Sequence, residues 1–142
     1  MKICMVSSEA VPFIKSGGLA DVVSALSSSL RDLGDDVRVV LPRFSSVLSD
    51  DLTDRGEMIV TMGLGDEQCR LYETRLPETE VPVYFIDHPV FSERPGLYGR
   101  SGSHTYRDNH FRFALFSRAA IELCRTLSWL PAVFHAHDWQ TA

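Results

Sequence analysis

The sequence predicts an α/β domain built on a parallel sheet. Residues 2–7 (KICMVS) form a short apolar run, residues 19–33 repeat apolar side chains along one helix face, and residues 36–42 (DVRVVLP) form a second apolar run. A strand, a helix and a strand within about 40 residues make a βαβ unit, whose strands are parallel and whose crossover is right-handed. The 142 residues, 44% of them hydrophobic, suffice for one domain with its own core.

The first helix is predicted to run from residue 19 to a stop at Gly34. Its apolar side chains recur at the spacing of one helical face: Leu19, Val22, Val23, Leu26, Leu30 and Leu33. Gly34 stands where a glycine commonly ends a helix, and Pro42 ends the strand that follows. Residues 8–18, between the first strand and this helix, are a predicted loop that contains Pro12 and a pair of glycines.

The middle of the chain predicts a loop, a hairpin and another strand. Residues 43–57 are rich in Ser and Asp, which is typical of a loop. Residues 58–63 and 69–76 are predicted strands of a hairpin around GLGDEQ. Residues 81–87 form a further predicted strand, in which Pro82 is tolerated because it stands near the start.

The last third of the chain predicts a long irregular segment, a helix and a final strand. Residues 88–107 are rich in Pro and Gly, and segments of this kind inside a compact domain are often functional. A helix is predicted over residues 109–127, with Asp108 as its N-cap. Its expected buried face consists of Phe113, Phe116, Ala120, Leu123 and Leu127. The final strand, AVFHAHDW, stops where an α/β chain would begin its next helix, so we expect a truncated piece of a longer protein.

Charge, hydropathy and cysteine usage exclude several classes of protein. A net charge of -5 argues against a surface that binds nucleic acid. No apolar run approaches the length of a membrane span, and MKICMV breaks at Ser7 too early for a signal peptide. Cys4, Cys69 and Cys124 are far apart and form no CxxC pair, which favours buried thiols in a reducing compartment. We therefore expect a cytoplasmic protein with no membrane or nucleic-acid partner.

Lys15, Gly17 and Gly18 stand together at the mouth of the first helix and indicate a phosphate-binding loop. Glycines let an anion approach the free N–H groups and the positive dipole end of a helix, and a lysine adds a full charge. The pattern is neither GxxxxGK[ST] nor GxGxxG. The alternative is a turn that needs a residue with positive φ, with Lys15 in solvent. Asp21, in the first helical turn, also fits dipole compensation or capping.

His135, His137 and Asp138 form a polar cluster at the carboxyl end of the last strand. Ligands of open α/β sheets bind outside the carboxyl ends of the strands, and the Lys15 loop opens at the same edge, so we expect one shared crevice. Three interpretations remain open. The histidines could bind a metal, although further ligands are not evident. They could be buried, satisfied polar groups, above all His135. Alternatively, His137 and Asp138 could contact a sugar, because a carboxylate suits developing positive charge.

Several motifs together resemble one enzyme family. MKICMVSSEAVPFIKSGGLADVV resembles the opening of bacterial glycogen synthases and plant starch synthases, and HAHDWQTA resembles a strand end of the same family. The segments DHPVFSERPGLYG and YRDNHFRFALFSRAAIE also fit the pattern of this family. The resemblance therefore covers nearly the whole chain, and residues 43–80 are its least distinctive part. The resemblance implies a Rossmann-like parallel sheet with helices on both faces. Residues 1–142 would be part of the N-terminal domain of a GT-B glycosyltransferase, with the C-terminal nucleotide-binding domain beyond Ala142.

The resemblance also implies a reaction and roles for individual residues. Such enzymes transfer glucose from ADP-glucose to the non-reducing 4-OH of an α-1,4-glucan with retention. The implied substrate-binding residues are Lys15, Gly17, Gly18, Asp21, Tyr98 and His137. Asp138 is the implied catalytic residue, at the glucosyl or acceptor site. No cofactor and no metal are expected, because Lys15, helix dipoles and cations of the missing domain would neutralise the leaving diphosphate. The fragment alone is expected to be inactive.

Two other functions stay open at this point. The first is a non-catalytic module that binds a nucleotide-sugar or a glucan and whose chain ends at residue 142. The second is a metal-dependent hydrolase that uses His135 and His137 as metal ligands. Within the enzyme interpretation, KxGGLADV fits an ADP-glucose donor better than UDP-glucose. The aromatic side chains Phe91, Tyr98 and Tyr106 either stack on sugar rings or fasten residues 88–107 to the core.

Overall fold

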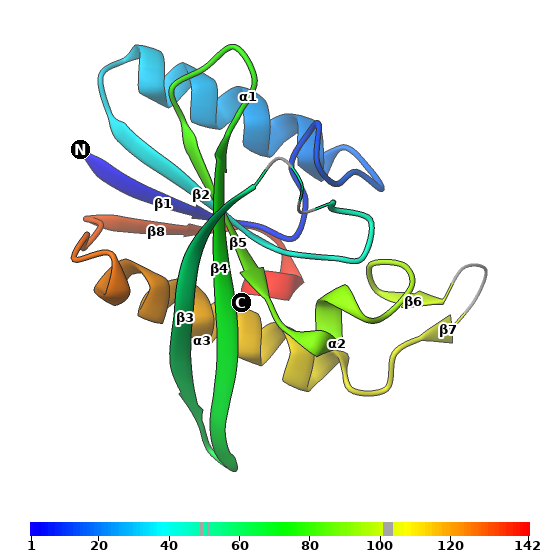
Figure 1. Ribbon diagram of the computed structural model, residues 1–142. Helices are drawn as coiled ribbons and strands as arrows, with labels where there is room; N and C mark the ends of the chain where they lie inside the picture. Colours follow the sequence, from blue (N-terminus) through cyan, green and yellow to red (C-terminus); the bar gives the residue numbers. More distant parts are fainter. Residues whose placement is uncertain (49, 51, 101–103) are drawn as a thin grey trace.

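A computed structural model describes residues 1–48, 50, 52–100 and 104–142. Within these residues, a six-stranded sheet has the order β3-β4-β5-β2-β1-β8. Its strands are β1 (Lys2–Val6), β2 (Asp36–Pro42), β3 (Thr53–Met62), β4 (Gly65–Arg75), β5 (Pro82–Asp87) and β8 (Val133–Ala136). The helices are α1 (Leu19–Asp32), α2 (Pro89–Ser92), α3 (Asn109–Thr126) and a 3-10 turn at Trp139–Thr141. Figure 1 shows α1 and α3 on opposite faces of the sheet, as the sequence predicted.

Four neighbouring strands, β5-β2-β1-β8, run parallel. The chain proceeds outward from β1 through β2 to β5 and then returns through α3 to β8 on the other side of β1. This is the strand order with which a Rossmann sheet begins, and it places a topological switch point between β1 and β8. The register there pairs Ile3 with Val133 and Val6 with Ala136. The predicted βαβ unit and Rossmann-like fold are therefore confirmed.

The remaining strands make the sheet mixed rather than wholly parallel. β3 and β4 form the predicted hairpin, which pairs with β5 in the antiparallel direction. Both strands are longer than predicted, because β3 begins at Thr53, inside the expected loop, and β4 already begins at Gly65. Only Gly63 and Leu64 separate the paired residues Met62 and Gly65. Polar residues hid these strand ends from the sequence pattern, since an edge strand tolerates charged side chains.

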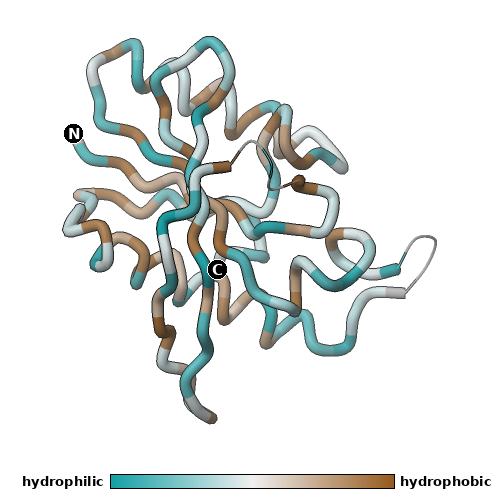
Figure 2. Tube along the Cα trace, in the orientation of Figure 1, coloured by the Kyte–Doolittle hydropathy of each residue, from teal (hydrophilic) through white to brown (hydrophobic). Residues whose placement is uncertain are grey.

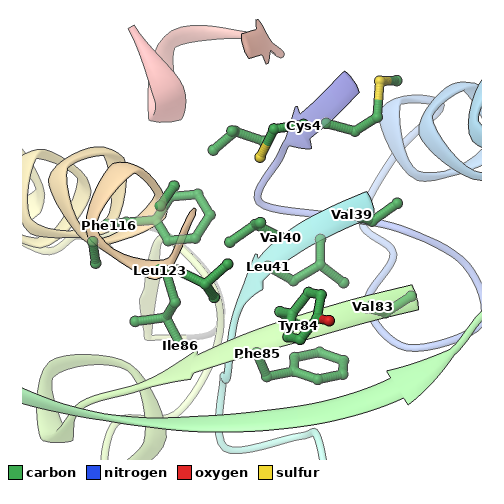
Figure 3. Packing of buried hydrophobic residues seen from close by; sticks show 14 of the residues in the cluster. Cys4, Val39, Val40, Leu41, Val83, Tyr84, Phe85, Ile86, Phe116 and Leu123 are labelled. Carbon is green, nitrogen blue, oxygen red and sulfur yellow. The ribbon is translucent and has the colours of Figure 1, made fainter. Parts of the chain in front are cut away.

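The core lies between the sheet and its two long helices. β2 is buried through most of its length, as expected of a central parallel strand. Figure 3 shows Phe116 and Leu123 of α3 pointing toward Val40 and Ile86 of the sheet. Figure 2 shows hydrophobic residues concentrated in the central strands. None of the described helices combines the length and hydropathy of a membrane span.

The buried face of α1 is narrower than the sequence predicted. Ala20, Val23 and Ser27 are buried, whereas Val22 and Leu33 are 56% and 80% exposed. These two positions were predicted to be buried, but α1 contacts the sheet through a stripe of small side chains that faces away from them. The helix ends at Asp32, and Gly34 follows with a φ of +93°, which confirms the predicted stop.

α3 confirms the predicted helix but not its predicted cap. Phe113, Phe116, Ala120 and Leu123 are buried, and Leu127 packs partly buried against the core. Asp108 occupies the N-cap position without a capping side-chain bond, because its carboxylate accepts a hydrogen bond from Arg94 Nη1 at 2.8 Å. The segment 88–107, expected to be irregular, contains α2 and a small ribbon of β6 (Gly99–Arg100) and β7 (His104–Thr105). Gly102 lies outside the described residues.

Candidate functional site at the switch point

The two predicted motifs leave the sheet at the same edge. β1 and β8 are parallel neighbours, so the loop after β1 and the residues after β8 both begin at the carboxyl ends of these strands. The N–H of His137 donates to the carbonyl of Val6 at 3.0 Å, which fixes the start of the second motif against the end of β1. The predicted meeting of both motifs at one edge of the sheet is confirmed, and the edge is the switch point where such sheets bind ligands.

Gly17 and Gly18 are not required by the fold itself. Neither has a positive φ, and a Cβ atom built on either would meet no other atom within 4 Å. The alternative of a turn that demands positive φ is therefore wrong. Gly18 is the N-cap of α1, and no side chain caps the first turn, so the first N–H groups of this helix have no side-chain partner at the cap. An anion can approach this backbone at a place that a side chain would fill.

Lys15 lies beside the same helix terminus. Its Nζ is 2.8 Å from the carboxylate of Asp21, in the first turn of α1, and both side chains are about half exposed. Lys15 is thus ion-paired rather than free in solvent. An exposed ion pair of this kind is weak, so an incoming anion of higher charge can compete with Asp21 for the lysine.

Glu9 is a site residue that the sequence did not predict. Its buried carboxylate accepts hydrogen bonds from the N–H and the hydroxyl of Ser16 at 2.5 and 2.6 Å, and from the hydroxyl of Tyr98 at 2.5 Å. Burial by itself raises the pKa of Glu9, but the hydrogen bonds from Ser16 and Tyr98 outweigh it and hold the pKa below the usual range. Its only sequence signal was the S-E pair directly after the first strand.

Tyr98 connects the two motifs. Its hydroxyl reaches Glu9, and its ring centroid lies 5.7 Å from that of Trp139 and 5.9 Å from that of Phe113. Burial, together with the Glu9 carboxylate, raises the pKa of Tyr98. Phe91, by contrast, is fully buried among aromatic side chains of the core. Phe91 therefore fastens residues 88–107 to the core and is not available to stack on a sugar ring.

Asp138 has an unusual backbone conformation. Its φ is +64° and its ψ is -178°, a region that is essentially reserved for glycine, and its carboxylate accepts the N–H of Trp139 at 2.7 Å. Such strain costs on the order of 1–3 kcal/mol and is typical of functional positions. Asp138 and Trp139 are both exposed at the switch point.

The two histidines differ in their surroundings. His135 is exposed, so its expected role as a buried, satisfied polar group is wrong. His137 is buried, and its ring stacks on that of His135 with centroids 4.2 Å apart. Burial, and to a lesser extent His135, lowers the pKa of His137, which is therefore neutral at pH 7. Its Nε2 has no hydrogen-bond partner among the described residues. In that part of the chain, no three His, Cys, Asp or Glu side chains gather as metal ligands would.

A Rossmann-like sheet with a glycine loop, a lysine and a strained carboxylate at its switch point has the architecture of α/β domains whose ligands bind at the carboxyl ends of the strands. Residues 2–142 match the family model described as the starch synthase catalytic domain. The chain belongs to this family.

Named relatives agree with this assignment. The chain is 46% identical over 140 residues to the glycogen synthase of Treponema denticola, covering 98% of the chain and 28% of the relative. It is 46% identical over 146 residues to glycogen synthase 1 of Geobacter sulfurreducens, covering 100% and 29%. The fold matches the catalytic domain of starch synthase IV from Arabidopsis thaliana, bound to ADP and acarbose, with a TM-score of 0.80 and 27% identity over 99% of this chain and 28% of that one. The chain thus spans less than a third of the length of these proteins.

Proposed function

We propose that this chain is the N-terminal part of a cytoplasmic glycogen synthase, which transfers glucose from ADP-glucose to the non-reducing 4-OH of an α-1,4-glucan with retention. Support comes from the family, from relatives named glycogen synthase and from a similar starch synthase bound to ADP and acarbose. The free cysteines fit a reducing compartment. A C-terminal nucleotide-binding domain then completes the site from a part of the protein that these residues do not include.

The open space at Gly17 and Gly18 is the observation that carries the proposal. A helix dipole contributes only about 0.3–1 kcal/mol at an exposed site, which is too little to select a diphosphate. Lys15 adds a full charge beside the uncapped N–H groups of α1. Together these groups suit the diphosphate of ADP-glucose, and they can stabilise the charge that develops on ADP as it leaves.

On the other side of the switch point, Asp138 and His137 suit the sugar. The bond between the anomeric carbon and the diphosphate oxygen breaks, and its electron pair stays with ADP. The 4-OH of the acceptor then bonds to this carbon and gives its proton to the departing phosphate. The Asp138 carboxylate stabilises positive charge at the anomeric centre. His137, with its unpartnered Nε2, can bind a sugar hydroxyl, and the exposed ring of Trp139 offers a surface for stacking.

The proposal is tested in the full-length protein with two glycine variants. We expect it to transfer labelled glucose from ADP-glucose to glycogen, and UDP-glucose to be the poorer donor. Gly17→Ala should raise the KM for ADP-glucose roughly tenfold with an unchanged melting temperature, because the added methyl group fills the open space beside the first turn of α1. Gly34→Ala is the matched control, because Gly34 has a φ of +93° far from the site. It should lower stability by about 1 kcal/mol without changing the KM.

Failure of the full-length protein to transfer glucose from either donor would refute the proposal. If the protein then still bound ADP or a glucan, the non-catalytic binding module would be the better interpretation. Unchanged kinetics of Lys15→Ala in an active enzyme would remove the role assigned to Lys15.

A further inference from the structure

We propose that Glu9 is a positioning residue for glucosyl transfer: its carboxylate fixes the backbone of the Lys15 loop and, through Tyr98, joins that loop to the residues that follow β8. This inference rests on the proposed function. It concerns a residue that would not touch either substrate and would act through the groups that do.

The carboxylate of Glu9 is saturated with donors from the protein itself. Oε2 accepts the N–H groups of Ser16 at 2.5 Å and Gly17 at 3.4 Å, and Oε1 accepts the hydroxyl of Ser16 at 2.6 Å and that of Tyr98 at 2.5 Å. Glu9 is only 3% exposed, so water does not compete for these donors. Charge-assisted hydrogen bonds in a buried setting are the strong ones; three of these four hold the loop, and the fourth holds Tyr98.

This arrangement divides the glycine loop into two parts. The N–H groups of Ser16 and Gly17 are already used by an anion of the protein, so they are not available to a phosphate group of the substrate. Gly18 and the first turn of α1 have no side-chain cap and remain open to the substrate. Glu9 thereby fixes the position of the Gly17 backbone, and it does not bind the N–H groups of Gly18 and the first turn of α1.

Glu9 is itself held rigidly, as a positioning residue must be. It follows the buried end of β1 after only Ser7 and Ser8, and the hydroxyl of Ser7 contacts it twice: the N–H of Glu9 donates to Ser7 Oγ at 3.2 Å, and Ser7 Oγ donates to the carbonyl of Glu9 at 2.9 Å. Glutamine in its place would keep one acceptor oxygen but lose the negative charge, so the hydrogen bonds from the Ser16 and Gly17 N–H groups would be weaker and the Ser16 and Tyr98 hydroxyls would have to turn and accept from the amide NH₂.

Tyr98 carries the constraint across the switch point. The Tyr98 hydroxyl is also within 2.8 Å of Ser8 Oγ, and the backbone carbonyl of Tyr98 accepts a hydrogen bond from Asn109 Nδ2 at 2.8 Å, so both the hydroxyl and the backbone of this residue are held. Its ring packs at a tilt of 52° against the ring of Trp139, the neighbour of Asp138. A continuous set of contacts therefore runs from the Lys15 loop through Glu9, Tyr98 and Trp139 to Asp138.

The test uses the full-length protein with Glu9→Gln, Tyr98→Phe and the double variant. Tyr98→Phe keeps the ring and removes only the hydroxyl, so it remains informative should Glu9→Gln fail to fold. We expect each single variant to lower kcat/KM for ADP-glucose at least tenfold, through both kcat and KM, with the melting temperature nearly unchanged. The double variant should be little worse than the more severe single variant, because both break one network. Glu57→Gln, an exposed carboxylate on the hairpin, is the matched control and should match the wild type.

Amide hydrogen exchange gives a second readout that does not depend on activity. The Ser16 and Gly17 amides should exchange slowly in the wild type, and at least tenfold faster in Glu9→Gln but not in Glu57→Gln. Wild-type kinetics in both Glu9→Gln and Tyr98→Phe, strictly multiplicative effects in the double variant, or unprotected amides in the wild type would each overturn the inference. A wild-type protein that transfers no glucose refutes the proposed function instead, and the exchange data then still decide whether Glu9 fixes the loop.

Discussion

At the scale of single residues, Asp138 combines a chemical role with a conformational cost. Its φ of +64° and ψ of -178° suit glycine, yet an aspartate stands there and pairs with the N–H of the next residue. A fold selected for stability alone would place glycine at this position. The strain is retained at the switch point, where the carboxylate projects beside the residues that end β8.

Two substitutions separate the charge of Asp138 from its strain. Asp138→Asn keeps the side-chain acceptor and the backbone strain but removes the charge, so transfer should fall at least about a hundredfold with the melting temperature unchanged. Asp138→Gly relieves the strain, so transfer should be lost while the free energy of unfolding rises by about 1 kcal/mol. Urea unfolding and initial rates on the full-length protein check both values. A destabilised Asp138→Gly variant would show that the strain is not real.

The site residues were predictable to different degrees from the sequence. Lys15, Gly17 and Gly18 are recognisable because a helix mouth concentrates their chemistry in a few consecutive positions. Glu9 is different: its partners stand seven and 89 positions away, at Ser16 and Tyr98, and no local period links them. Contacts of this kind arise only when the topology brings two loops to one edge of the sheet.

At the scale of elements, Arg112 attaches α3 to the segment that precedes it. This arginine is fully buried. Its Nε donates to the carbonyl of Val90 at 2.9 Å, and its Nη1 donates to the carbonyl of Leu97 at 3.0 Å and to Asn109 Oδ1 at 2.7 Å. The guanidinium carbon also lies 4.8 Å from the ring centroid of Tyr106. The segment that presents Tyr98 is therefore held by one planar cation.

Arg112→Lys should be clearly destabilising although it keeps the charge. A lysine ammonium cannot reproduce the planar fork, so at least one buried carbonyl loses its donor, at a cost of about 1–3 kcal/mol. Arg118→Lys, on the exposed side of the same helix, should change the free energy of unfolding by less than about 0.5 kcal/mol. Urea unfolding of the two variants measures the difference. Equal stabilities would mean that Arg112 does not hold the segment.

The ends of helices and strands were predictable where a local sequence pattern sets them, and not where tertiary contacts set them. The strand Asp36–Pro42 was predicted to the residue, because a continuous apolar run ends at a proline. The ends of the hairpin were missed, because Thr53–Glu57 is polar and is ordered by pairing with β4 rather than by its own pattern. Asp108 was assigned to capping from its position alone, and Arg94 takes its carboxylate instead.

At the scale of the whole molecule, the reactivity of the three cysteines shows whether the core is folded. Cys4, Cys69 and Cys124 are buried and lie in β1, β4 and α3, so together they sample the core between α3 and the sheet. Burial, with help from Glu67 and Asp87, raises the pKa of Cys69 to about 12. The hydrogen bond to Cys124, and then burial, raises the pKa of Cys4 as well. The thiolate, which is the reactive form, is therefore disfavoured at Cys4 and Cys69. The hydrogen bond to Cys4 lowers the pKa of Cys124, so burial is what protects this third thiol from reagents.

We expect these thiols to resist alkylation until the domain unfolds. With N-ethylmaleimide at pH 8, peptide mass mapping of the native full-length protein should find all three cysteines unmodified within minutes. In denaturing urea, all three should be labelled over the same period. Rapid labelling of Cys4 or Cys124 in the native protein would mean that the packing of α3 on β1 opens readily.

The pairing of β1 with β8 also governs when the site comes into being. These two strands join residues near opposite ends of the described chain, whereas β1–β2 and β2–β5 join residues much closer in sequence. Closing the longer loop costs more chain entropy, and during synthesis β8 emerges from the ribosome after the other five strands described here. Until then β1 has one open edge, and the Lys15 loop has no Asp138 beside it. Asp138 and the Lys15 loop therefore come together only after β8 has been synthesised and has paired with β1.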